Sequence, residues 1–324
     1  MTTSSAPGKI ILFGEHAVVY NRPALAVPVM QVHADVEVLD SPRAGIWINA
    51  PDVNLHAEVS TLPSDHPIAS VINKFVPHPS PSPLAPLPQG EGIDINITST
   101  IPVASGLGSG AAVSVALIRA LSSFLLRPLS DEQVNHLAYE IEKIHHGTPS
   151  GIDNTVITYA KPVYFIKKPP ASDNRDTGGK VETIKVGTPF TIVIGDTGIP
   201  ALTKESVGDV RKLWRMHQVH WESIFDEIGQ IALMARRAIE SGRPDMLGEL
   251  MDQNHAFLQE LTVSSPELDK LVDAARKAGA LGAKMSGGGR GGNMIALVTP
   301  DLAESVTRSM QEAGARNVII TKVE

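Results

Sequence analysis

The sequence predicts a mixed α and β protein built of two lobes. Its 324 residues suffice for one large domain or two ordinary ones. The first hundred residues carry short β-branched or alternating runs, and helical patterns take over after residue 109. The second half reads as a strand, three helical segments, and a closing strand, helix and strand. We therefore expect an N-terminal lobe over residues 1–185 and a C-terminal lobe over residues 186–324.

The strands expected in the first hundred residues are broken by Gly, Pro and Asn, and they lie at 10–13, 24–29, 32–40 and 93–100. Segment 76–92, VPHPSPSPLAPLPQGEG, is too dense in Pro and Ser for a regular element. We expect an extended surface loop in this segment.

The next elements are expected to be helical. Residues 111–126 are apolar on nearly every face, which predicts a buried helix. A second helix begins with the capping-box spacing of Ser130 and Gln133 and ends at Gly147. Its apolar stripe consists of Val134, Leu137, Ala138, Ile141 and Ile144. Beyond it we expect strands at 156–166, 190–198, 294–300 and 317–323, a polar turn at 171–180, and helices at roughly 204–240, 244–260, 266–279 and 301–313.

The composition excludes several classes of function. The 28 basic and 35 acidic residues give a formal net charge of −7 without any run of Lys or Arg, so nucleic-acid binding is not expected. The absence of cysteine excludes disulfides, thiolate metal sites and a cysteine nucleophile. No signal sequence is recognisable, and no stretch approaches the ~20 apolar residues of a spanning helix. We expect a cytoplasmic protein with no membrane partner.

The stretch SGLGSGAA (105–112) follows a strand-like run and opens the buried helix. Glycines allow the backbone to approach a ligand closely, and the first N–H groups of a helix lack intrahelical partners. Phosphate is therefore the expected ligand. The alternative is a tight turn with a serine cap, and this motif alone does not decide between the two. It is neither a Walker A loop nor a Rossmann fingerprint. A second glycine cluster, SGGGRGGN (286–293), makes a phosphate cradle more probable.

Two further clusters carry charge. In EIEKIHHGTPSGIDN (140–154), Glu142 lies at the margin of the apolar stripe and Asp153 lies in a turn. Their ordinary interpretations are a solvated flank and a turn cap. In SAPGKIILFGEHAVV (5–19), Lys9 opens an apolar strand that Glu15 and His16 end. A lone lysine there would be an edge residue, but three titratable groups around one short strand favour a site.

Together, the four segments in this order resemble the GHMP small-molecule kinases over nearly the whole chain. The HG-x-PSG-x-DN segment is most similar to that of the branch that phosphorylates mevalonate. The resemblance implies an α+β fold with an N-terminal lobe like ribosomal protein S5 and a ferredoxin-like C-terminal lobe. It also implies an active site between the lobes, where ATP and Mg²⁺ act on mevalonate in isoprenoid precursor biosynthesis. A homodimer is expected from the family.

The resemblance also assigns roles to positions of this chain. Asp153 matches the catalytic base, Lys9 the lysine beside it, and Glu142 a magnesium ligand. The substrate-pocket positions are Glu15, His16, Thr203 and Gly288, the last within the glycine motif 286–292. The phosphate loop comprises Ser105, Gly106, Leu107, Gly108, Ser109, Gly110 and Ala111. Phosphoryl transfer needs positioning, a divalent cation and neutralised charge, so this set is chemically sufficient.

Two positions depart from the family pattern. Gly110 stands where the family usually has a second serine that touches the metal, so we expect Ser109 or a water to take its place. Arg290 stands where another glycine is usual, and we expect it to point to solvent. The adenine pocket is expected near residues 70–92, by analogy. The alternatives are a kinase for another small alcohol or for phosphomevalonate, a related decarboxylase, or a non-catalytic binding protein of the same fold.

Overall fold

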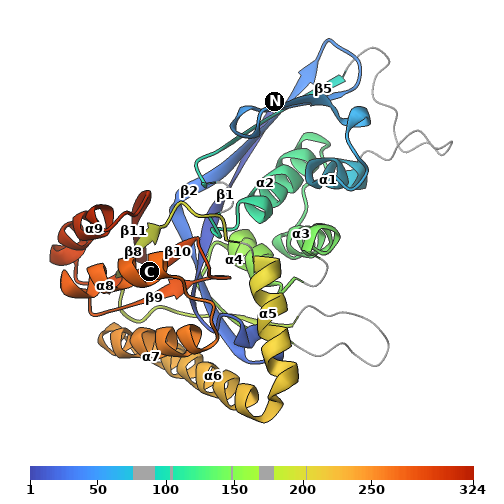
Figure 1. Cartoon of the computed structure of the whole chain (residues 1–324). Helices are drawn as coiled ribbons and strands as arrows, with labels where there is room; N and C mark the ends of the chain where they lie inside the picture. Colours follow the sequence, from blue (N-terminus) through green and yellow to red (C-terminus); the bar gives the residue numbers. More distant parts are fainter. Residues whose placement is uncertain (76–91, 103–104, 147–148, 168–178, 202) are drawn as a thin grey trace.

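A computed structural model gives the structure of the protein, and it describes residues 1–75, 92–102, 105–146, 149–167, 179–201 and 203–324. The chain forms two sheets, one in each half of the sequence. Figure 1 shows the long first sheet running through the molecule, with α1 to α4 gathered along one side of it. The expected loop 76–92 and the turn 171–180 lie almost entirely outside the described residues.

The first sheet has seven strands in the order β4-β3-β5-β2-β6-β7, with β1 paired to β2. The long β2 is its centre, because it pairs antiparallel with β1, β5 and β6. The strand continues past Pro28 and through Met30 and Gln31, so the two strands expected at 24–29 and 32–40 are one. The strands are β1 (Thr2–Phe13), β2 (Pro23–Ser41), β3 (Ile46–Ala50), β4 (Leu55–Glu58), β5 (Gly92–Ser99), β6 (Val163–Ile166) and β7 (Lys180–Thr183).

The first lobe holds α1 (Pro67–Phe75), α2 (Ser109–Phe124), α3 (Asp131–His146) and α4 (Ile152–Tyr159). Helix α2 is buried as expected, and it packs on β1 and β2. The capping box is confirmed, because the Ser130 N–H donates to Gln133 Oε1 at 3.0 Å and the Gln133 N–H donates to Ser130 Oγ at 3.3 Å. Ile144 of the expected stripe is exposed at the end of α3.

The second sheet has the order β11-β8-β10-β9, and all of its pairings are antiparallel. With helices before the second strand and after the third, this is the ferredoxin-like arrangement that the family resemblance implies. Its strands are β8 (Phe190–Asp196), β9 (Gly282–Ser286), β10 (Asn293–Val298) and β11 (Asn317–Val323). Its helices are α5 (Thr203–Met216), α6 (Gln218–Glu240), α7 (Leu247–Glu260), α8 (Pro266–Lys277) and α9 (Ala303–Glu312).

One of the hydrophobic clusters extends across both lobes. A single cluster of buried side chains joins Val36 and Leu117 of the first lobe to Ile192 and Leu297 of the second. The chain passes from one sheet to the other between Thr183 and Phe190, and the division at residues 185/186 stays a prediction. Among the described residues, no helix combines the length and apolar character needed to cross a bilayer.

Two element predictions are wrong. Residues 152–159 form α4 where a strand was expected to begin at 156. Ile152, Val156 and Ile157 are buried together, so packing overrides the β preference of branched residues. The helix expected over 204–240 is two helices, because the backbone leaves the helical region at His217, where φ is −143°. Strands β3, β4, β7 and β9 and helix α1 were not predicted.

Candidate active site

Lys9 and Asp153 form an ion pair at the centre of the candidate site. Lys9 lies in β1, and its side chain is 6% exposed. Its Nζ lies 3.0 Å from Asp153 Oδ1, whose side chain is 32% exposed. Asp153 lies in the first turn of α4, where the positive end of the helix dipole stabilises a carboxylate. A buried ammonium therefore holds a carboxylate that ligands can still reach.

Glu142 belongs to the same charge cluster. It is partly buried on α3, and its pKa is raised well above the usual range, first by burial and then by the negative charge of Asp153, with Lys9 opposing. The charges of Asp153 and Lys9 thus both act on Glu142, and an additional cation would stabilise its ionised form. No group of three or more candidate metal ligands occurs among the described residues. A cation that takes few protein ligands and keeps several waters, as Mg²⁺ does, fits this set.

The phosphate loop lies directly against Lys9. The Lys9 N–H donates to Leu107 O at 2.9 Å. Gly108, at φ 76°, is the N-cap of α2, and no side chain caps this helix. A Cβ at Gly108 would lie 3.0 Å from Lys9 Cγ and 2.9 Å from Ile157 Cδ1, so a side chain there would collide. The serine-capped turn is therefore not formed, and the helix N-terminus is left for a ligand.

Gly110 has room for a side chain. A Cβ built there meets no heavy atom within 4 Å, and the residue is exposed at the first turn of α2. Ser109, its neighbour, is partly buried, and both residues line a pocket. A serine at position 110 would thus be accommodated without rearrangement.

The second glycine cluster meets the first. Asn293 Nδ2 donates to Ser105 O at 2.6 Å, and a Cβ at Gly292 would lie 3.0 Å from the same carbonyl. Gly288 approaches Thr203, since a Cβ there would lie 2.6 Å from Thr203 Oγ1. The structure therefore gathers three segments that are distant in the sequence.

The corner after β1 carries Glu15 and His16. His16, at φ 60°, lies 3.1 Å through Nε2 from Gly288 O. A carbonyl only accepts, so Nε2 carries the proton. Burial lowers the pKa of His16 to about 4, and the Gly288 contact opposes this shift, so the ring is neutral near pH 7. The Glu15 carboxylate is fully buried, and it contacts the ammonium of Lys284 and Asn254 Nδ2.

No role was predicted for Lys284 or Asn293. Lys284 has the same signal that pointed to Lys9, a lysine within a run that becomes a buried strand. Asn293 follows two glycines at the start of a strand. Arg290 does not point freely to solvent as expected. Its Nη1 lies 2.5 Å from Asp209 Oδ2 on α5, and its N–H donates to Val263 O.

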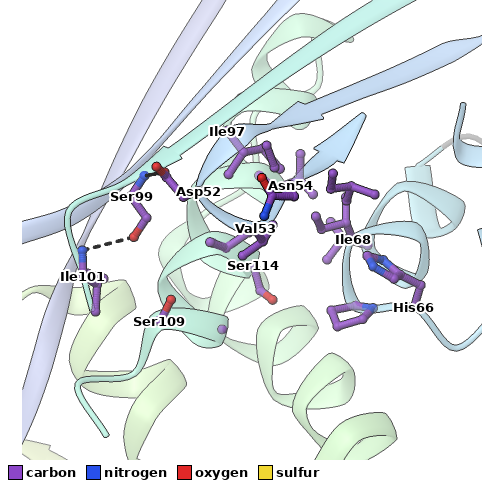
Figure 2. A pocket seen from close by; sticks show the side chains of 17 residues that line it. Asp52, Val53, Asn54, His66, Ile68, Ile97, Ser99, Ile101, Ser109 and Ser114 are labelled. Atoms are coloured by element: carbon purple, nitrogen blue, oxygen red, sulfur yellow. Dashed lines mark hydrogen bonds between the residues drawn. The ribbon is translucent and has the colours of Figure 1, made fainter. Parts of the chain in front are cut away.

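A pocket of about 400 Å³ adjoins the first turn of α2 (Figure 2). Its lining is largely apolar and comes from residues 50–55, 66–71, 97–101 and 109–117. Most of the range expected for the adenine pocket, 70–92, lies outside the described residues, and of the described residues 70–75 and 92 only Val71 lines this pocket. In Figure 2, Asn54 and Val53 lie opposite His66 and Ile68 across this space.

A lysine–aspartate pair beside an uncapped, glycine-rich helix N-terminus fits the GHMP kinases, and comparison with known families agrees. The family described as GHMP kinases N terminal domain matches residues 71–161, and GHMP kinases C terminal matches residues 235–316. The chain is thus a GHMP kinase.

Individual relatives narrow this class. A mevalonate kinase of Pyrococcus abyssi is 35% identical, and the match covers 98% of this chain and 95% of that relative. A mevalonate kinase of Pyrococcus horikoshii is 36% identical, and the match covers 96% of this chain and 92% of that relative. The L. major mevalonate kinase in complex with R-mevalonate is 28% identical, with a TM-score of 0.84 over 100% of this chain and 96% of its own. The chain belongs to the mevalonate kinase family.

Proposed function

We propose that this chain transfers the γ-phosphoryl group of ATP to the 5-hydroxyl of mevalonate, as a step of isoprenoid precursor biosynthesis. The observation that carries the proposal is the Lys9–Asp153 pair at 3.0 Å beside the uncapped N-terminus of α2. It combines a reachable carboxylate, a fixed positive charge and an anion-binding helix end in one place.

Asp153 is the base in this proposal, and Lys9 is its partner. The carboxylate accepts the proton of the 5-hydroxyl as the oxygen attacks the γ-phosphorus, and the bond to the β-phosphate oxygen breaks to release ADP. The Lys9 ammonium keeps Asp153 ionised before the transfer and neutralises charge on the phosphoryl group during it. Since Lys9 is nearly buried, it holds this position without a ligand.

The phosphates lie at residues 105–111, where the first N–H groups of α2 and the glycines receive them. Glu142 and the Ser109 hydroxyl are the protein oxygens that would hold Mg²⁺. When bound, this ion neutralises charge on the β- and γ-phosphates. The adenosine lies in the apolar pocket of Figure 2, because that pocket opens beside Ser109 and Gly110.

Mevalonate lies on the other side of Asp153, at the corner formed by His16, Thr203 and Gly288. These three residues meet at the loop after β9. A neutral His16 with Nε2–H engaged leaves Nδ1 as an acceptor for a hydroxyl. Glu15, which is buried behind this corner, supports it through Lys284.

The test is ATP consumption with mevalonate, phosphomevalonate, homoserine and galactose, each over a magnesium titration. Turnover with mevalonate that depends on magnesium is expected. Preference for another alcohol would reassign the substrate, and no turnover with any of the four would favour a binding protein. A cytoplasmic location and a homodimer stay predictions, which fractionation and light scattering test.

A further inference from the structure

The hairpin of β9 and β10 lies where the lobes meet. β9 is the edge strand of the second sheet, yet all five of its residues are buried. In its middle, Lys284 has no exposed side-chain surface, and its ammonium contacts the equally enclosed Glu15. Nζ also donates to Met285 O at 2.7 Å. The backbone of this edge is bonded by side chains of α7 and α8 in the same lobe, and the Lys284–Glu15 ion pair joins the two lobes.

The same hairpin reaches two other parts of the N-terminal lobe. Ser286 Oγ donates to Ile11 O of β1 at 2.7 Å. Asn293, at the other end of the turn, donates through Nδ2 to Ser105 O at 2.6 Å. One end of the hairpin thus contacts the corner proposed for mevalonate, and the other contacts the loop proposed for the phosphates.

We infer that the hairpin is a positioning element with two separate tasks. Lys284 holds Glu15, and with it the adjoining His16 corner, for mevalonate. Asn293 holds Ser105, and with it the phosphate loop, for ATP. Neither residue touches a reacting atom, so both are positioning residues. This inference rests on the proposed assignment of the two segments to the two substrates.

Stability alone does not account for these side chains. A buried ion pair is often no more stabilising than apolar residues of the same volume, because both charges lose their water. Asn293 Oδ1 is buried and has no hydrogen-bond partner among the described residues, and an unsatisfied buried oxygen is unfavourable. What both residues supply is a contact of fixed geometry between the lobes, and an apolar side chain would not supply it.

The test of the first task is Lys284→Met, with steady-state kinetics for both substrates. The mevalonate KM should rise about 10- to 100-fold, because a small misplacement of the corner is sufficient for such a loss. The ATP KM should stay near its wild-type value. If the single variant does not fold, Glu15→Gln/Lys284→Met leaves no unpaired buried charge. Its mevalonate KM should also be raised, and a wild-type value in a folded variant would overturn the inference.

The test of the second task is Asn293→Ala, for which the opposite pattern is expected. The ATP KM should rise about 10-fold or more, and the mevalonate KM should change little. Equal rises of both KM values in either variant would indicate general loosening, and would overturn the two-task arrangement.

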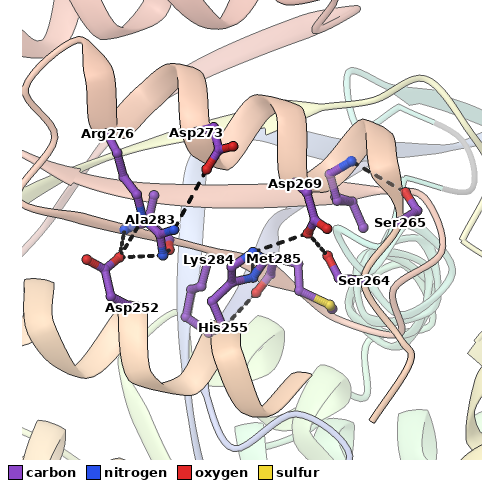
Figure 3. Close-up of polar contacts among 11 residues, drawn as sticks. Asp252, His255, Ser264, Ser265, Asp269, Asp273, Arg276, Ala283, Lys284 and Met285 are labelled. Carbon is purple, nitrogen blue, oxygen red and sulfur yellow. Dashed lines mark hydrogen bonds and ion pairs between the residues drawn. The ribbon is translucent and has the colours of Figure 1, made fainter. Parts of the chain in front are cut away.

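Matched controls come from the same lobe. Arg276 pairs with Asp252 and donates to Ala283 O, so Arg276→Met breaks an ion pair beside β9 (Figure 3). Asn317 lies opposite Asp196 in β11, as Asn293 does in β10, so Asn317→Ala removes a matched amide. Both controls should keep wild-type KM values.

Asp153→Asn, measured in parallel, separates the two proposals. An inactive Asp153→Asn together with unchanged KM values in both hairpin variants would overturn only the hairpin inference. An active Asp153→Asn would overturn the site assignment itself.

Discussion

The candidate active site has one lysine–carboxylate pair at its centre and a second beside it, and the two pairs differ in their exposure. In the pair of Lys9 and Asp153, the aspartate side chain is 32% exposed. In the pair of Lys284 and Glu15, neither side chain has any exposed surface. Both lysines lie in buried strands and both carboxylates follow a glycine-containing turn, so the local sequence does not distinguish the pairs.

The difference in exposure distinguishes a pair that can take part in the reaction from a pair that only holds the site in place. A carboxylate that substrate can reach is able to accept a proton and return it to solvent. A carboxylate enclosed with its ammonium cannot do so without breaking the pair, and breaking a buried pair is strongly destabilising. We therefore assign the reaction to the first pair and the fixed geometry of the corner to the second.

The largest effect is expected from Asp153→Asn. The amide keeps the shape but neither accepts the proton nor carries charge, so kcat should fall about 10²- to 10⁴-fold. ATP binding should stay near its wild-type value. The control is Asp226→Asn, an exposed carboxylate paired with Arg22. A near-normal kcat for Asp153→Asn would leave this residue as a turn cap.

The second prediction compares stability between the pairs. Lys284→Met leaves Glu15 buried without its partner, and the free energy of unfolding should fall by about 3–5 kcal/mol. Lys9→Met should lower it less, because water reaches Asp153, although this change should lower kcat strongly. Urea denaturation of the two variants checks the difference. Equal losses of stability in the two variants would show that the two pairs do not differ in this respect. Full activity of Lys9→Met would exclude Lys9 from the reaction.

The third prediction concerns how the free energy of unfolding depends on pH through two buried histidines, His16 and His255. Burial lowers the pKa of His16, next to Glu15, to about 4, and burial also lowers the pKa of His255 to about 4. An unfolded histidine titrates near 6.5, so the unfolded state binds more protons as the pH falls from 6.5 to 4. The free energy of unfolding is therefore fully retained above pH 6.5 and falls below it.

At pH 4, protonation of each histidine in the unfolded state has lowered the free energy of unfolding by about 3 kcal/mol. His16→Gln should lose its part of this slope, and His56→Gln, at an exposed position, is the control. Unfolding experiments between pH 4 and 8 measure the effect. A slope that is the same in wild type and His16→Gln would show that His16 does not titrate in this way.

The smallest effect is expected in the phosphate loop, which lies beside the more exposed pair of Lys9 and Asp153. Gly110→Ser adds a hydroxyl where there is space, so the apparent magnesium requirement should change more than the mevalonate KM. Ser109 does not cap α2, so the lower turnover expected for Ser109→Ala would not come from a lost cap. Kinetics of both variants across a magnesium titration are the measurement. If Ser109→Ala is silent and Gly110→Ser leaves the magnesium dependence unchanged, the loop acts through its N–H groups alone.

Several features could be predicted because their signals are local. The capping box of Ser130 and Gln133 depends on one spacing, and the burial of α2 depends on one apolar run. The error at residues 156–159 has the opposite cause. Branched residues there prefer strands, but their burial together on α4 outweighs that preference.

By itself the sequence determined the family, the two-lobe fold and the order of the motifs, since these follow from residue patterns within short windows. The family resemblance already placed Lys9 beside Asp153, but only the tertiary structure paired Lys284 with Glu15. Glu15 and Lys284 are 269 positions apart, and no pattern along the chain pairs them. Their contact, and the burial that distinguishes it from that of Lys9 and Asp153, arises when β9 of one lobe packs against β1 and the corner after it in the other, because burial is a property of the packed molecule.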